Sequence, residues 1–174
     1  MADAPRLEAW LRGPLPGVDP FLMPAAHALV QCREDVEAAV AGLLPPQLSL
    51  RPGGAASLGF HLRHIAGSLD RLLTYARGEA LSEAQRAAAR GEKDERPGQD
   101  AASLVAEVTR AVEAALAQLR ATPRETLLEA RPVGRAGAPS TVLGLLVHAA
   151  EHAQRHAGQA LTTATVVKGQ PPTA

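Results

Sequence analysis

The stretch from Ser140 to Leu161 constrains this chain most, because it predicts a helix with histidines at positions 148, 152 and 156. Each step of four residues turns only about 40° around a helix axis, so the three imidazoles share one face. Ser140 is the expected N-cap, and the remaining residues are apolar almost all round, which predicts a buried helix. Buried ring nitrogens need partners, which either a divalent metal or a network of protein hydrogen bonds would supply.

Hydrophobic periodicity predicts three further long helices, and together the four helices predict an all-α four-helix bundle. Their expected ranges are 21–44, 58–77, 100–120 and 140–161. The polar stretch 78–99, with a short helix at 82–90, is a long connection of the kind that serves as a crossover between helices 2 and 3. We expect an irregular lead-in at 1–20, the bundle at 21–165 and a frayed tail at 166–174.

The charge balance and the cysteine content indicate which partners and which cellular compartment to expect. The 18 basic and 18 acidic side chains cancel, which argues against a nucleic-acid partner or an anionic membrane surface. Cys32 is the single cysteine, so no internal disulfide forms and a reducing compartment fits best. The N-terminus lacks the apolar core of a signal peptide, and no window has the roughly 18 apolar residues that span a bilayer. We therefore expect a cytoplasmic protein.

Two histidines of the second helix make a shared metal site conceivable. A pair such as His152 and His156 reaches one ion from a single helix, and catalytic zinc commonly takes a third protein ligand from elsewhere. His61 and His64 lie on successive turns of the helix at 58–77. Helical phase favours His61 slightly, so both remain candidates at this stage. The other interpretation is that the histidines form hydrogen bonds within the core.

Glu151 is the one general-base candidate near these histidines. It stands in a His-x-x-Glu-His pattern with His148 and His152. The simpler interpretation is a surface carboxylate paired with Arg155 at i+4.

Two segments resemble a known family, the DinB-like proteins. Residues 50–54 and 57–66 resemble the loop and second helix of the family, and residues 146–159 resemble its last-helix signature, in which His-x-x-x-His is followed closely by Gly158-Gln159. The layout matches over roughly residues 20–165. The resemblance implies a four-helix bundle with a long crossover, often a homodimer, and a divalent metal held by His64, His152 and His156. His61 is kept in reserve, and His148 is a neighbour one turn away.

The resemblance also implies a function. Related metal-dependent members transfer low-molecular-weight thiols, such as bacillithiol or mycothiol, to electrophilic small molecules. We therefore expect a zinc- or nickel-dependent thiol S-transferase or hydrolase acting on a small-molecule substrate. The alternative is a non-enzymatic metal-binding or stress-response bundle protein.

Overall fold

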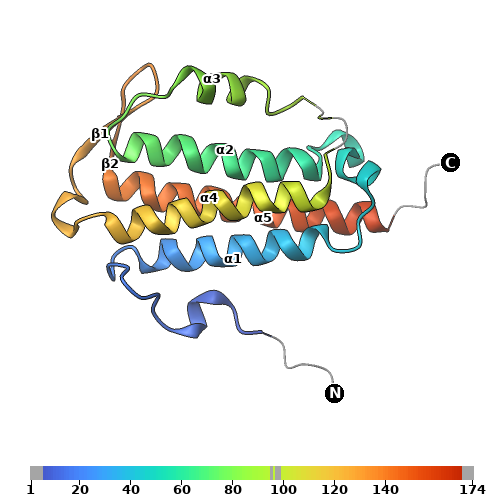
Figure 1. The fold of residues 1–174 in the computed structure, drawn as a ribbon, viewed down its shortest axis with the longest axis horizontal. Coiled ribbons are helices and arrows are strands. Elements are labelled where there is room, and N and C mark those ends of the chain that lie inside the picture. The colour runs from blue at the N-terminus through green and yellow to red at the C-terminus, as the bar shows by residue number, and fades with distance from the viewer. Residues whose placement is uncertain (1–5, 95, 97–98, 170–174) are drawn as a thin grey trace.

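The computed structural model describes residues 6–94, 96 and 99–169, and most of them are helical (Figure 1). A short helix and a two-stranded antiparallel hairpin lie between the long helices, and four 3-10 turns complete the described elements. The long helices are α1 (Met23–Val40), α2 (Leu58–Ala76), α4 (Ala101–Ala121) and α5 (Val142–Lys168). The shorter elements are α3 (Glu83–Arg90), β1 (Ala130–Val133), β2 (Ala138–Thr141) and the turns Ala9–Arg12, Pro45–Ser49, Pro52–Gly54 and Arg124–Thr126.

The four long helices form a bundle in which α5 and α4 each pack against both α1 and α2. In Figure 1, α2 and α4 run in one direction, and α1 and α5 run in the other. The connection that carries α3 runs along α2 and returns the chain to the end where α2 began, which is what two consecutive parallel helices require. The predicted all-α bundle with a crossover between its second and third long helices is confirmed.

Side-chain hydrogen bonds cap the N-termini of the long helices α2, α4 and α5. Ser57 and Asp100 cap α2 and α4 as expected, because their side-chain oxygens accept the backbone N–H three residues on. The cap of α5 is Thr141 and not Ser140, because the helix begins at Val142 and the Thr141 hydroxyl accepts the backbone N–H of Gly144 at 3.0 Å. The hairpin β1–β2, which precedes this helix, was not predicted.

The last helix is longer and less buried than expected. It continues to Lys168, well past Leu161, so residues 166–168 of the expected frayed tail at 166–174 are helical instead, while residues 170–174 lie outside the described residues. One face of the helix is buried through small residues, but His148, Glu151 and Arg155 are exposed on the other side. The prediction of a helix buried all round was therefore wrong. None of the described helices combines the length and the apolar character that a membrane crossing needs.

Candidate metal centre

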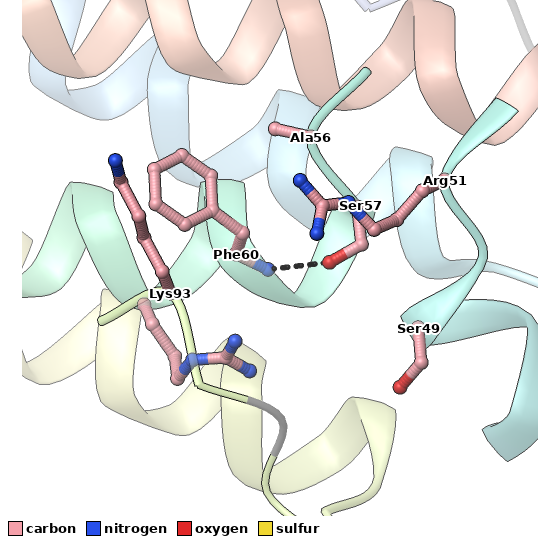
Figure 2. A pocket seen from close by; sticks show the side chains of 7 residues that line it. Ser49, Arg51, Ala56, Ser57, Phe60 and Lys93 are labelled. Atoms are coloured by element: carbon pink, nitrogen blue, oxygen red, sulfur yellow. Dashed lines mark hydrogen bonds between the residues drawn. The ribbon is translucent and has the colours of Figure 1, made fainter. Parts of the chain in front are cut away.

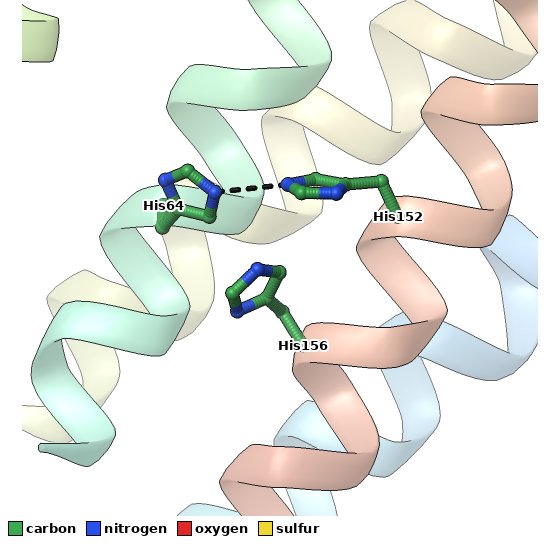
Figure 3. A group of neighbouring side chains, drawn as sticks. All are labelled: His64, His152 and His156. Carbon is green, nitrogen blue, oxygen red and sulfur yellow. Dashed lines mark hydrogen bonds between the residues drawn. The ribbon is translucent and has the colours of Figure 1, made fainter. Parts of the chain in front are cut away.

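Three histidines from two helices converge between α2 and α5. His64 projects from the second turn of α2, and His152 and His156 project from successive turns of α5 (Figure 3). Each offers one ring nitrogen to a group whose ligand atoms all lie within 4.8 Å of one another. The closest contact joins His64 Nε2 and His152 Nε2 at 2.9 Å. The structure thus brings together the three side chains that the family resemblance implied, and their binding of a metal stays a prediction.

A carboxylate from the crossover orients His64. The Nδ1–H of His64 donates to Glu92 Oε2 at 2.7 Å, and Arg71 donates to the other carboxylate oxygen. Glu92 follows α3 and is only 7% exposed. Burial alone would raise the pKa of its carboxyl, but the hydrogen bonds from His64 and Arg71 outweigh burial and leave the pKa below its ordinary value. With its proton held at Nδ1, a neutral His64 presents the Nε2 lone pair to the centre.

His61 supports the cluster without joining it. Its buried ring lies with Nδ1 3.0 Å from His156 Nδ1. One of these two nitrogens donates to the other, so the contact occupies the side of the His156 ring that faces away from the centre. The helical phase left both His61 and His64 as candidates. The structure places His64, and not His61, in the convergent group.

His148 does not take part in the cluster. Its side chain is 52% exposed, and its Nδ1 lies 3.3 Å from Glu151 Oε2. Glu151 also accepts from Arg155 Nε at 3.0 Å, as the simpler interpretation of this residue predicted. The hydrogen bond from Arg155 holds the pKa of the exposed Glu151 carboxyl below its usual range. Glu151 is therefore a surface partner of Arg155 rather than a base directed at the cluster.

The cluster favours neutral imidazoles. Desolvation is the first cause and mutual repulsion of the rings the second, and together they lower the pKa values of His61 and His152. The same two causes lower the pKa of His156 to about 4. Since metal binding requires deprotonated imidazole, His152 and His156 need no proton removal at neutral pH.

The donor set fits a divalent transition metal. Imidazole suits zinc, nickel, copper and iron. The ligand atoms of the three histidines lie within 4.8 Å of one another, and an ion that forms Zn–N bonds of about 2.0 Å would reach all three after small movements of the side chains. In the part of the chain that the structure describes, His152 Nδ1 is buried without a hydrogen-bond partner. This ring is therefore held by packing and by its Nε2 contact alone, and that Nε2 is the nitrogen aimed at the centre.

Glu92 and Arg71 are the functional neighbours that sequence reasoning missed. Glu92 belongs to a charge cluster in a polar connection, where periodicity carries no information about burial. Only the folding of the crossover back over α2 brings it to His64.

Comparison with known families gives one match. The sequence matches the model of the DinB superfamily over residues 28–160, which covers most of α1 and the whole segment from α2 into α5. No curated protein matches the sequence. The matched range includes all three convergent histidines and Glu92.

Proposed function

This chain belongs to the DinB superfamily, and we propose that it binds a divalent metal, zinc or nickel, through His64, His152 and His156. We further propose that the bound metal serves a thiol S-transferase or hydrolase reaction on a small molecule. The observation that carries the proposal is the convergence of three imidazoles from α2 and α5 on one point.

Three neutral ligands suit an activating role. A divalent metal held by imidazoles keeps its full positive charge, and it would lower the pKa of a bound thiol or water enough to favour the anion near neutral pH. A three-residue ligand set also leaves coordination positions for a small molecule. Beside the cluster, a hollow of about 620 Å³ lined by His61, His156 and Phe60 offers room for one.

The thiol of the chain itself is not available as the nucleophile. Cys32, the single cysteine, has no exposed surface. Burial, aided by the charge of Asp35, raises the pKa of its thiol to about 12, so it neither ionises nor reaches a substrate at neutral pH. This supports a low-molecular-weight thiol or a water as the attacking group.

The fixed side chains supply orientation. Glu92 holds the His64 proton at Nδ1, and His61 engages Nδ1 of His156, so both rings keep Nε2 directed at the centre. Phe60 stacks on His64 with ring centroids 5.4 Å apart and planes 11° apart, which shields one face of that imidazole from water. In an S-transfer, the thiolate sulfur forms a bond to the electrophilic carbon, and the leaving group departs with its electron pair.

Metal content tests the binding step. Wild-type protein should copurify with, or take up, close to one zinc or nickel per chain by elemental analysis, and His152→Ala should lose nearly all of it. His148→Ala is the matched control, since this histidine lies on the same helix outside the cluster. Equal, near-zero metal in wild type and His152→Ala would end the proposal.

Thiol consumption tests the chemistry. Metal-loaded wild type should accelerate thioether formation between a low-molecular-weight thiol and an aromatic electrophile, followed by absorbance, and His152→Ala should not. Metal binding without acceleration of either thiol transfer or hydrolysis would favour the alternative of a non-enzymatic metal-binding or stress-response protein.

Assembly and location are further parts of the proposal. We propose a homodimer, to be checked by light scattering, which should give twice the mass of one chain. We also propose a cytoplasmic location and no nucleic-acid partner. The charge balance of the sequence supports the latter.

A further inference from the structure

A small basic cavity lies beside the three-histidine centre, where the N-terminus of α2 meets the crossover (Figure 2). Its volume is about 130 Å³. Three cationic side chains line it, Arg51, Arg63 and Lys93, together with the hydroxyl-bearing Ser49 and Ser57. Among the described residues, no carboxylate lines it. We call this space the basic cavity.

Arg63 gives the basic cavity a fixed and largely buried charge. Its side chain, in a residue only 8% exposed, donates to Gln99 Oε1 at 2.8 Å and to the carbonyl oxygens of Glu92 and Asp94. All of these acceptors within the described ranges are neutral oxygens. The carboxylates of Glu107, Glu92 and Asp94 act on it only at longer range, and the charge of Arg96 opposes them. Arg63 therefore holds the crossover in place while keeping a positive charge without a bonded anion.

The other lining groups add mobile charge and a hydroxyl donor. Arg51 and Lys93 are exposed at the rim, so their side chains are able to adjust to a ligand. Ser57 Oγ accepts from the backbone N–H of Phe60 at 3.2 Å as the helix cap, and its own O–H has no acceptor among the described residues. Cations and hydroxyl donors on one wall suit an anion such as a carboxylate or a phosphate.

Phe60 connects the basic cavity to the metal centre. The ring lines the cavity, and it also stacks on the imidazole of His64. Phe60 and Ala56 belong in addition to the wall of the larger hollow beside His156. The two spaces are therefore neighbours, and one molecule could fill both.

We propose that the basic cavity binds an anionic group, a carboxylate or a phosphate, of the molecule whose reactive end lies at the three-histidine centre. The position of that reactive end rests on the proposed function, whereas the anion site depends only on the cavity. A volume of about 130 Å³ admits one such group rather than a whole substrate, so the rest of the molecule extends past Phe60 into the larger hollow.

The test is an NMR titration of the metal-free protein with two probes, inorganic phosphate and succinate. We expect saturable shifts of the backbone amides of Ser57, Phe60 and Lys93, and the tighter probe identifies the anion class. Arg51→Gln and Lys93→Gln should each weaken binding about tenfold, since each removes a charged hydrogen-bond donor. Arg110→Gln, an exposed arginine of α4 with the same loss of charge, should leave the affinity unchanged.

The variants are chosen so that a loss of anion binding cannot arise from unfolding or from loss of the metal site. Arg63 is not substituted, because its loss would also release the crossover, whereas Arg51 and Lys93 are exposed and should leave folding intact. His152→Ala should bind phosphate and succinate as wild type does, so failure of the metal proposal would not hide an anion site. No saturable shift at these amides, or equal affinity in the Arg51, Lys93 and Arg110 variants, would overturn the proposal.

Discussion

Glu92 lies in a polar connection, yet it orients one of the three convergent histidines. Its carboxylate accepts from His64 and Arg71 and is buried at the junction of the crossover and α2. Carboxylates that accept from the far nitrogen of a ligating histidine fix the ring and increase its basicity. The metal affinity of the three-histidine cluster should therefore depend on a residue that never touches the metal.

Substitution of Glu92 tests this dependence. Glu92→Gln keeps the shape but removes the negative charge, so the affinity for zinc should fall by about 10- to 100-fold. Competition with a chromophoric chelator measures the change. Glu113→Gln, on the exposed face of α4, is the matched control and should bind zinc as wild type does. An unchanged affinity in Glu92→Gln would show that packing alone orients His64.

The clustered imidazoles also predict how stability depends on pH. In the unfolded chain His156 takes up a proton near its ordinary pKa of about 6.5, whereas in the folded protein its pKa is about 4. The unfolded state binds this proton more tightly, so acid favours unfolding. The free energy of unfolding should therefore decrease as the pH falls from about 6.5 to about 4. The pKa values of His61 and His152 are lowered as well, so both act in the same direction.

Urea denaturation of the metal-free protein at several pH values measures the effect. The ring of His156 is partly exposed, so the loss should be on the order of 1 kcal/mol after allowance for solvent screening. His156→Gln should show a shallower fall over this interval than wild type. His148→Gln, outside the cluster, should follow the wild-type curve, and a wild-type curve that is flat over the interval would contradict the prediction.

Among the elements, α2 and α4 were the most predictable from sequence, because their apolar residues recur at helical spacing and their capping residues, Ser57 and Asp100, precede that pattern. The hairpin β1–β2 was not predictable in the same way. Its eight residues include Pro132 and Pro139, which are rare in strands and are tolerated here because each strand of a two-stranded sheet has an unpaired edge. The position of Glu92 depends on how the crossover folds over α2, which no local pattern encodes.

Gly67 of α2 lies directly against the Glu92 side chain of the crossover, with no room for a Cβ. A Cβ at this position would overlap Glu92 Oε1 and would lie 2.9 Å from Arg71 Nη1. Gly67→Ala should therefore displace the Glu92 carboxylate, weaken zinc binding and lower the free energy of unfolding by about 1–2 kcal/mol. The lost contacts should outweigh the gain in helix propensity.

A second glycine provides the control for this substitution. Gly158 lies on the exposed face of α5, where a Cβ would meet nothing within 4 Å. Gly158→Ala should stabilise the protein by up to about 1 kcal/mol and leave zinc affinity unchanged. Chelator competition and urea denaturation of both variants separate the two effects. Equal zinc affinity in Gly67→Ala and Gly158→Ala would show that the crossover adjusts at no cost to the centre.

Taken as one folding unit, the bundle has a core that does not require a metal. Helices α2 and α5 pack together along their lengths, and fully buried side chains such as Leu62, Ile65 and Leu146 belong to one continuous apolar cluster. These apolar contacts hold the two helices together whether or not a metal is bound. If the three-histidine cluster serves catalysis rather than folding, the metal-free protein should still fold.

Removal of the metal should leave the protein folded. The chelated wild type should keep its helical circular dichroism and unfold cooperatively, because its core is intact. Added zinc at about 100 times its dissociation constant should stabilise the native state by about 2.7 kcal/mol, which raises the melting temperature by about 5–10 °C. His152→Ala should show no such rise, and His148→Ala should show the full rise. If chelation instead unfolds the wild type, the metal is structural, and the three-histidine cluster serves to fasten α2 to α5 rather than to activate a bound molecule.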